Sequence, residues 1–489
     1  MSVTQPKATL QHRQYTAICL LAACVFVWNP VTATSSWPLA YFLVCILFIV
    51  AVFPLVCTYA DGRFDFFEPI TGICVLYFIY FGVASIYNLN TLSKVRLTIN
   101  IEDGLEVALV YAVLALVSLQ AGYRLVGKWV RSVVVHEPIQ GEGWNRIFRV
   151  SAGVYAIGLG ARVYGVSQGF HIRFAASDIY GQFSGIHILY DYLGFFSTFG
   201  FILMAAYSFM APRPRGGRVL VWGVMLPIEL FFAFLGGPKE YFVPILIAPL
   251  ICYHYGRRAV PVYKFLIPLS VMALIVFPVM TSYRSLDPRY LRSAALMDAV
   301  PYAISGVWEV VSEKGLLEYL RWSLELVVER LDGIYTFTGV LLNVPSPMEY
   351  QWGKTIIVGF ALLVPTVIWE GKYDYYVATI TWGERIFGVP VGGGGISITQ
   401  PGEMFLNFGI FGMLLGMFLL GGAYRLIHHW LVGSRYFFGI VIYAILWMTL
   451  VNPEYPLAAY YSNAVKQAAL LFLISKIGGA RWRRKRIGP

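Results

Sequence analysis

The sequence predicts an all-α membrane protein whose chain crosses the bilayer many times. Apolar runs of about 20 residues, the length that spans a bilayer as a helix, recur from one end of the chain to the other. Charged residues make up only 13% of the chain, against about 25% in soluble domains. Basic residues gather in alternate connectors, as the positive-inside rule requires. We therefore expect residues 1–489 to form a single integral membrane domain with about twelve transmembrane helices.

Each expected span is an apolar run that stops at proline, glycine, asparagine or a basic connector, which are residues that end helices. Asn29-Pro30 closes the first span, and Gly236-Gly237-Pro238 makes a tight turn after the seventh. In chain order the expected spans are residues 15–28, 38–59, 69–89, 103–124, 147–166, 188–210, 219–235, 241–255, 265–281, 404–426, 436–451 and 456–477.

The orientation follows from the connectors that are rich in Lys and Arg. They all fall on the cytoplasmic side if the N-terminus is inside and if residues 356–369 do not cross. That apolar run is too short for an ordinary span, and we expect it to be re-entrant or interfacial. Both termini are then cytoplasmic, residues 167–187 form an outer loop and residues 282–403 form a large one. The basic segments are 124–146, 211–218, 256–264, 428–435 and the tail 479–489.

Charge and cysteine usage exclude several classes of function. The net charge is +11, yet the outer loop 282–403 holds nine Lys or Arg against thirteen Asp or Glu. The excess of positive charge therefore reflects how the chain is oriented in the membrane, and we expect no nucleic-acid partner. All six cysteines lie in apolar runs, so we expect neither a disulfide framework nor a cysteine metal site. The outer loops hold no histidine pair at metal spacing, and we expect no metal.

Residues 314–331, inside loop 282–403, have the pattern of an amphipathic helix. Leucine and valine recur at helical spacing on one face. Glu318, Arg321 and Glu325 fall on another face, where they can pair at separations of three and four residues. We expect this helix to lie along the outer membrane surface.

Two charges lie within expected spans. Glu229 in the seventh span and Lys466 in the last are functional candidates by default, because a charge inside the bilayer is costly. A mutual ion pair that holds the helices together is the alternative interpretation.

Residues 351–412 form the one long segment that is neither a plain span nor a short connector. The first motif, LVPTVIWEGK, contains a Pro-x-x-x-Trp-x-x-Lys run that ends at Lys372. The second, GGGGISITQPGEMFLNFGIFG, has a glycine run and then a Gly-Glu…Asn-Phe-Gly helix start. This segment resembles the Wzy-type oligosaccharide repeat-unit polymerases of bacterial surface polysaccharides. The resemblance covers the second half of the chain, from about Val219, and the first half loosely.

The resemblance implies a membrane glycosyltransferase of GT-C-like fold in the bacterial inner membrane, with an active site that faces the periplasm. Its reaction would polymerise O-antigen or exopolysaccharide repeat units. A hydroxyl of one lipid-linked unit would attack the anomeric carbon of a glycan carried on undecaprenyl pyrophosphate, with inversion and without a metal. The implied partners are the undecaprenyl-pyrophosphate-linked donor and acceptor and membrane lipids, with a chain-length regulator as a further candidate; no cofactor is implied.

Two other functions remain open on the sequence alone. An O-antigen ligase would run the same chemistry with lipid A-core as the acceptor. A non-enzymatic flippase or transporter of lipid-linked glycans would carry cations along a membrane-embedded cavity. The candidate cations of this chain lie in outer loops, which favours the enzyme.

Cations in the outer loops are the candidates for holding a pyrophosphate. Arg284, Arg289 and Arg292 follow the ninth span, where guanidinium donors suit phosphate oxygens, although headgroup contact would also place arginines there. Lys239 lies in the turn after the seventh span, where family members often have a Gly/Ser–Arg turn; an interface anchor is the alternative. Arg173 lies in the outer loop after the fifth span, which the resemblance assigns to substrate, and an ordinary solvated arginine is the alternative.

A carboxylate is the candidate for orienting or deprotonating the acceptor hydroxyl, and we consider Glu403 and Asp332. Arg330 precedes Asp332 in a run similar to the Glu-Arg-x-Asp of some family members, although a helix C-terminus also favours an arginine. Glu403 begins a helix, where it could simply favour the dipole. Gly394 and Gly395 would let a bulky ligand approach the backbone, or form a hinge. The candidate catalytic residues are thus Arg284, Glu403, Asp332 and Arg330, and the candidate substrate-binding residues are Arg173, Lys239, Arg289, Arg292, Lys372, Gly394 and Gly395.

The topology predicts which positions can be labelled from outside. In a cysteine-free background, cysteines at Tyr350 and Tyr375 should both react with an impermeant maleimide added to spheroplasts, since only a non-crossing segment 356–369 keeps the basic tail inside. A cysteine at Arg483 should react only after the membrane is opened. Labelling of Tyr350 and Tyr375 from opposite sides would contradict the twelve-span topology.

Overall fold

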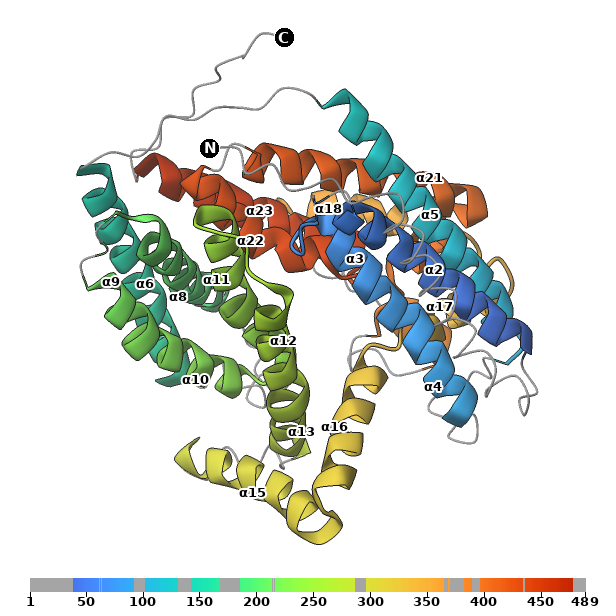
Figure 1. Ribbon diagram of the computed structural model, residues 1–489, viewed down its shortest axis with the longest axis horizontal. Coiled ribbons are helices and arrows are strands. Elements are labelled where there is room, and N and C mark those ends of the chain that lie inside the picture. Colours follow the sequence, from blue (N-terminus) through green and yellow to red (C-terminus); the bar gives the residue numbers. More distant parts are fainter. Residues whose placement is uncertain are drawn as a thin grey trace. The chain divides into compact units, whose positions relative to one another are not determined.

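The computed structural model consists of helices joined by turns and loops, with no strand among the residues that it describes (Figure 1). The first expected span, residues 15–28, lies outside those residues, and so do the basic tail and most of the outer loop 167–187. The structure describes residues 38–60, 62, 64–91, 102–130, 142–167, 185–212, 214, 216–285, 296–364, 368–369, 382–388, 396–433 and 436–477.

The described helices have the all-α, multi-pass membrane architecture that the sequence predicts. Seven of them are long and apolar enough to cross a bilayer, and each coincides with an expected span. The helix at Phe437–Val451 is also apolar but shorter. The seven are Pro38–Ala60, Pro69–Leu89, Leu105–Trp129, Leu193–Met210, Gly217–Gly236, Lys264–Ser285 and Gln400–Val432.

The chain divides into two compact units, and each is assembled from segments that are far apart in the sequence. A single cut of the chain would therefore not separate the units, because the chain passes from one to the other more than once. The first unit holds Met1–Arg131, Val328–His428 and Thr449–Lys466, and the second holds Ser132–Val327, His429–Met448 and Gln467–Pro489.

The first unit is organised around a span with a π-helical stretch in its middle. α3, η1 and α4 run without interruption, and η1 (Phe78–Val83) is the π-helical part, a feature that is frequent at functional sites. α2 and α5 pack against this span. The helices that lie wholly in this unit are α2 (Pro38–Ala60), α3 (Pro69–Tyr77), α4 (Ala84–Thr91), α5 (Leu105–Trp129), α17 (Gly333–Asn343), α18 (Lys354–Ala361) and α20 (Trp382–Phe387).

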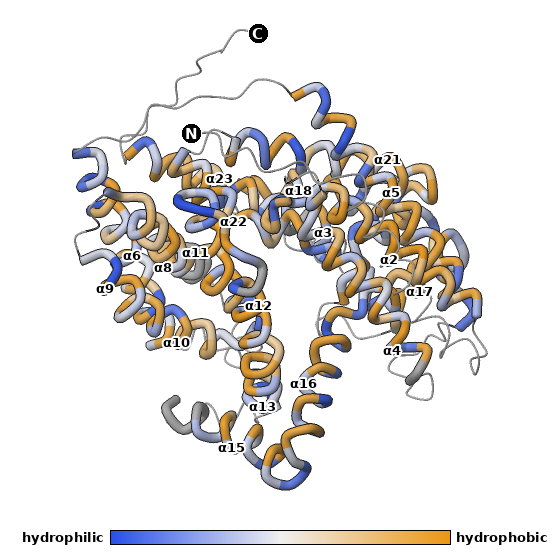
Figure 2. The backbone as a smooth tube through the Cα atoms, in the orientation of Figure 1, coloured by the Kyte–Doolittle hydropathy of each residue, from blue (hydrophilic) through white to orange (hydrophobic). Residues whose placement is uncertain are grey.

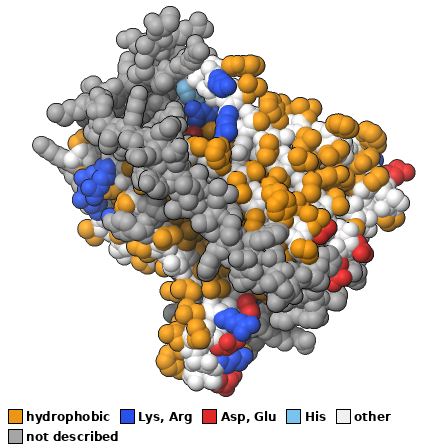
Figure 3. All heavy atoms as spheres, turned by 45° about the vertical axis from the view of Figure 1, so that its right-hand side comes forward, with side chains coloured by type: hydrophobic (Ala, Val, Ile, Leu, Met, Phe, Trp, Pro, Cys, Tyr) orange, Lys and Arg blue, Asp and Glu red, His pale blue; other side chains and the backbone are white. Residues whose placement is uncertain are grey.

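α5 has the exposure pattern of a helix that faces lipid. Val107, Val110, Leu114 and Val117 are exposed and recur at helical spacing. The opposite face of the helix is also apolar and is buried in the unit. Figure 3 shows apolar side chains gathered over this side of the first unit. A helix that is apolar all round suits a bilayer, where one face meets protein and the other meets hydrocarbon.

α21 (Gln400–Val432) is broken at Gly409, whose φ of +65° and ψ of −160° are not helical. Glycine adopts this positive φ at no steric cost. The residues before the break double back along those after it, because the Met404 sulfur lies against Gly416; in a straight helix these two residues would be about 18 Å apart. The tenth expected span is therefore not one straight helix. A short arm, residues 400–408, precedes a helix of membrane length.

The segment of residues 354–395 leaves the short arm and returns to it. The backbone N–H groups of Gln351 and Trp352 donate to carbonyl oxygens of the arm at 2.9 and 3.1 Å, and the chain after residue 395 leads back into the arm. The arm is about 14 Å long, less than half of the roughly 30 Å hydrocarbon thickness. α18 is shorter still, and residues 356–369 are not among the described helices that could cross a bilayer.

Two polar clusters mark opposite ends of the span made by α3, η1 and α4. Before its start, Glu68 accepts a hydrogen bond from the Tyr123 hydroxyl at 2.6 Å and pairs with Arg425 at 2.7 Å. Near its far end, the Asn88 amide donates to both carboxylate oxygens of Asp332 at 3.0 Å. Each cluster thus gathers residues that the expected topology places on one side of the membrane.

The second unit contains a buried ion pair between α6 and α10. Arg162 Nη1 lies 3.0 Å from Glu229 Oε2, and the Thr198 hydroxyl donates to the same oxygen at 2.8 Å. The sequence suggests Lys466 as the partner of Glu229, and Lys466 belongs to the first unit; the structure pairs Glu229 with Arg162.

Four helices contribute to both units: α16, α21, α22 (Phe437–Val451) and α23 (Leu457–Ile477). The helices wholly in the second unit are α6 (Glu142–Ser167), α8 (Gly185–Met210), α9 (Gly217–Val219), η3 (Leu220–Met225), α10 (Leu226–Gly236), η4 (Lys239–Tyr241), α11 (Phe242–Gly256), α12 (Val262–Val271), η5 (Met272–Val276), α13 (Phe277–Ser285) and α15 (Leu296–Lys314).

The expected amphipathic helix is present as α16 (Leu316–Arg330). It begins after Gly315, whose φ of +84° separates it from α15. Arg321 and Glu325 pair at 3.2 Å, four residues apart, as the pattern of charges predicts. Figure 2 shows apolar and hydrophilic residues interspersed along both α15 and α16.

The close packing of α5 against α21 gives a stability prediction. A Cβ at Gly122 would lie 1.9 Å from the Phe418 carbonyl oxygen, which belongs to the helix backbone. Gly122→Ala should therefore lower the melting temperature in detergent, because overpacking costs about 1–3 kcal/mol. Gly153→Ala is the control, since nothing lies within 4 Å of a Cβ at Gly153. Equal melting temperatures of the two variants would show that the packing is wrong.

Candidate functional site

The loop between α22 and α23 carries a carboxylate, Glu454, that binds side chains from two helices far away in the sequence. Glu454 Oε1 lies 2.5 Å from Arg330 Nη1 at the end of α16, and the Tyr80 hydroxyl donates to Glu454 Oε2 at 3.0 Å. Tyr80 is buried in η1, near the middle of the membrane-length span Pro69–Leu89. A carboxylate that is largely buried is costly unless it is paired, and Arg330 and Tyr80 are its partners. Tyr80, Arg330 and Glu454 are called the Glu454 cluster below.

Hydrogen bonds to the backbone fix the loop that carries Glu454. Gln400, at the start of the short arm, donates its side-chain amide to the Asn452 carbonyl at 3.0 Å and its backbone N–H to the Pro453 carbonyl at 2.7 Å. The Ser397 hydroxyl donates to the carbonyl oxygen of Glu454. A buried carbonyl without a partner costs about 1–3 kcal/mol, so these bonds determine where the loop lies.

The short arm begins at an unusual backbone position. Thr399 is fully buried and has a φ of +60°, which is uncommon for a β-branched residue. Its hydroxyl accepts from the Gly402 N–H at 3.3 Å and its carbonyl accepts from the Glu403 N–H at 2.9 Å, so Thr399 caps the arm. Backbone strain of this kind costs about 1–3 kcal/mol and clusters at functional sites.

The two carboxylates that the sequence suggests for catalysis make structural bonds. Glu403 is buried and accepts the backbone N–H of Leu457, the first residue of α23, at 2.6 Å. Asp332 caps α17 by accepting the Tyr335 N–H at 3.2 Å, and it also binds the Asn88 amide. Each carboxylate therefore fixes the start of one helix to a neighbouring segment, which is a structural role that needs no substrate.

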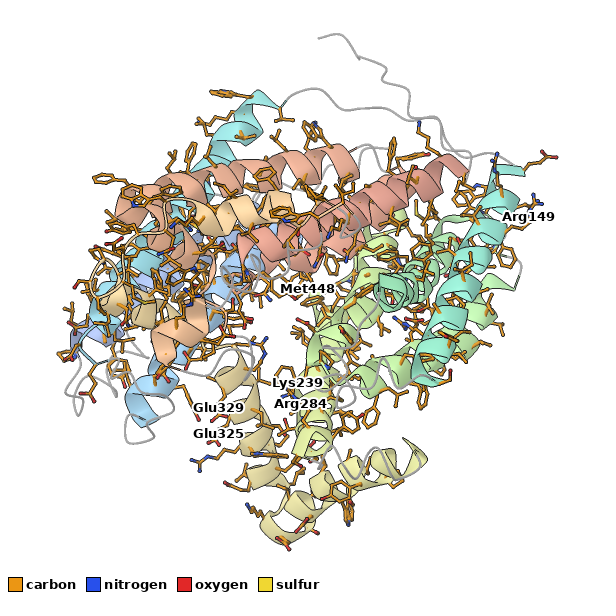
Figure 4. The ribbon with its side chains drawn as sticks, turned by 180° about the vertical axis from the view of Figure 1, so that it is seen from behind. Arg149, Lys239, Arg284, Glu325, Glu329 and Met448 are labelled. Atoms are coloured by element: carbon orange, nitrogen blue, oxygen red, sulfur yellow. The ribbon has the colours of Figure 1, made fainter. Side chains whose placement is uncertain are left out.

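A second group of candidates lies in the second unit, at the end of α13. Lys239 Nζ donates to Thr281 Oγ1 at 3.1 Å and lies 4.2 Å from the centre of the Phe277 ring. Arg284 is exposed and lies one helical turn after Thr281, on the same face of α13. Figure 4 shows Lys239 and Arg284 next to each other at this helix end. Among the described residues, none makes an ion pair with Arg284.

The structure thus places Arg330 in the Glu454 cluster, Glu403 beside the same loop, and Lys239 with Arg284. Within the described part of the chain, no group of three or more His, Cys, Asp or Glu side chains is arranged to hold a metal ion. The remaining candidates stay predictions, because they lie outside the described residues: Arg173, Arg289, Arg292, Lys372, Gly394 and Gly395.

Sequence reasoning missed Glu454 and Tyr80. Glu454 does carry a signal, because it is the only Asp or Glu that follows Glu403 in the chain, and it stands in the short run NPEYP between two apolar helices. Tyr80 carries no comparable signal, because the chain has 33 tyrosines and this one lies inside an apolar run. Its role depends on a contact that only the folded chain makes.

No known protein-family model, curated protein or solved structure matches the chain. The two groups of residues are therefore interpreted from their own geometry and charge. The first unit pairs a guanidinium with a carboxylate, whereas the second places Lys239 and Arg284 together at a helix end.

The capping role of Glu403 predicts a loss of stability on substitution. Glu403→Ala leaves the buried Leu457 N–H without its partner, which costs about 1–3 kcal/mol, so the melting temperature in detergent should fall. Glu325→Ala is the control, because the Glu325 side chain is 35% exposed and its ion pair with Arg321 contributes about 0–1 kcal/mol. A wild-type melting temperature in Glu403→Ala would rule out the capping role.

Proposed function

We propose that the chain is a membrane glycosyltransferase that polymerises undecaprenyl-pyrophosphate-linked oligosaccharide repeat units on the periplasmic side of the bacterial inner membrane. The observation that carries the proposal is the placement of Lys239 and Arg284 together at the end of the membrane-length helix Lys264–Ser285. A lipid pyrophosphate presents its charge at this boundary, and its oxygens suit a guanidinium. Arg284 has no ion-pair partner among the described residues, so it can bind an anion.

The proposed chemistry needs positive charge at the leaving group. A hydroxyl of the acceptor attacks the anomeric carbon of the donor, and the bond from that carbon to the phosphate oxygen breaks. Undecaprenyl pyrophosphate leaves with the electron pair, so negative charge grows on its oxygens during the step. Arg284 and Lys239 would stabilise that charge, which is the contribution that preorganised cations make to such transfers. We propose that the transfer inverts the anomeric carbon and needs no metal ion.

The fold supports the orientation that this function needs. The cluster around Glu68 gathers residues that the proposed orientation places in the cytoplasm, and the cluster around Asp332 gathers residues that it places outside. Both ends of the segment 354–395 lie at the short arm, which supports a segment 356–369 that does not cross. We propose twelve spans with both termini in the cytoplasm and residues 282–403 as a periplasmic loop.

The resemblance of residues 351–412 to Wzy-type polymerases also supports the proposal. Ser397 and Gln400, from this segment, bind backbone carbonyls of the loop that carries Glu454. The second motif therefore lies beside the Glu454 cluster inside the first unit. The partners that follow are the lipid-linked donor and acceptor, membrane lipids and a regulator of chain length.

Substitution of Arg284 tests the pyrophosphate site in cells. Arg284→Ala should abolish the polymer while protein levels stay near normal, because an exposed arginine contributes little to stability but much to a charge-assisted phosphate contact. Arg284→Lys should restore part of the polymer, since lysine cannot chelate two oxygens. Arg321→Ala, at a side chain that is 69% exposed, is the matched control and should leave the polymer intact. Full-length polymer made by Arg284→Ala would show that Arg284 only contacts lipid headgroups.

The purified protein should work without divalent cations. With lipid-linked repeat units in excess EDTA, it should form a ladder of products that differ by one repeat unit, because the cations of the site supply the charge that a metal would supply. A strict requirement for magnesium or manganese would contradict the proposal. A single transfer to lipid A-core, with no ladder, would identify the chain as a ligase.

A further inference from the structure

The two groups of cations differ in their surroundings, and the difference points to different ligands. Arg330 lies 2.5 Å from the Glu454 carboxylate, whereas Arg284 has no ion-pair partner among the described residues. A guanidinium that is already neutralised attracts a second anion weakly, because the neighbouring carboxylate repels that anion. The Glu454 cluster is therefore a poor site for a pyrophosphate.

The Glu454 cluster has the groups that a sugar hydroxyl needs. A hydroxyl both donates and accepts hydrogen bonds, so a carboxylate beside a guanidinium satisfies it. The side chains of Arg330 and Glu454 are 45% and 15% exposed, so both can meet a ligand. Among the described residues, each Glu454 oxygen has one partner, Arg330 on Oε1 and Tyr80 on Oε2, and a carboxylate oxygen can accept two hydrogen bonds.

The other carboxylates near this site have less capacity. Asp332 Oδ1 already accepts from the Asn88 amide and from the Tyr335 backbone N–H. Glu403 is only 2% exposed and binds the start of α23. Glu454 thus combines a side chain that is partly exposed with oxygens that each make one hydrogen bond to described residues.

We propose that the Glu454 cluster binds the sugar of the acceptor through its hydroxyl groups; this assignment rests on the proposed function. Glu454 accepts a hydrogen bond from a sugar hydroxyl. Arg330 contacts the sugar, and Tyr80 is a positioning residue that holds Glu454 Oε2.

The test uses the full-length protein in nanodiscs, with the undecaprenyl-pyrophosphate-linked repeat unit as donor and the lipid-free repeat-unit oligosaccharide as acceptor. Glu454→Gln keeps the size of the side chain but removes its charge, and it should raise the KM for the oligosaccharide acceptor by about tenfold. Tyr80→Phe removes one hydroxyl and should raise the KM for the acceptor about fivefold, while kcat and the KM for the donor stay unchanged. Glu325→Gln, a surface carboxylate on α16, should behave as the wild type.

Binding of the radiolabelled oligosaccharide, measured by equilibrium dialysis, separates this assignment from the proposed function. Arg330→Ala should weaken binding by about tenfold, whereas Arg284→Ala should leave it unchanged. Binding by Arg330→Ala that equals the wild type overturns the assignment, and so does a wild-type KM for the acceptor in Glu454→Gln. Should Glu454→Gln fail to fold, a wild-type KM for the acceptor in Tyr80→Phe overturns it. If the wild type forms no glycosidic bond but Arg330→Ala still weakens binding, the proposed function fails and the sugar site stands.

Discussion

The first unit depends on the hydrogen bonds that hold the loop between α22 and α23. Gln400 binds the carbonyls of Asn452 and Pro453, and the Glu403 carboxylate binds the N–H of Leu457 just after the loop. These groups are buried between apolar helices, where an unpartnered polar backbone group costs about 1–3 kcal/mol and where lipid offers no replacement. The loop can therefore keep its place only while the short arm of α21 lies against it.

This constraint explains the break at Gly409. A straight helix would carry Gln400 about 14 Å beyond the break, away from the helix that follows. The positive φ of Gly409 folds the arm back, and Gln400 then reaches both the loop and the Tyr424 hydroxyl. The position of Glu454 is thus a result of how the arm packs, and Arg330 and Tyr80 complete its surroundings.

The positions of the membrane-length helices could be predicted from the sequence, and the long-range contacts could not. Apolar length and helix-ending residues are local properties, so the seven described helices of membrane length lie where spans are expected. Gly409 permits a positive φ without requiring one, and its break has no local signal. The partners of Glu454 are 124 residues away at Arg330 and 374 residues away at Tyr80, so no pattern of spacing encodes them. Glu229 and its partner Arg162 are 67 residues apart and lie on different helices, so no pattern of spacing indicates this pair either.

The proposed reaction releases undecaprenyl pyrophosphate each time that a glycosidic bond forms. The most direct test is the ratio of undecaprenyl pyrophosphate released to glycosidic bonds formed by the purified wild-type protein with lipid-linked repeat units. We expect one molecule of undecaprenyl pyrophosphate for each glycosidic bond. Glycosidic bonds formed without release of undecaprenyl pyrophosphate, or release without bond formation, would contradict this expectation.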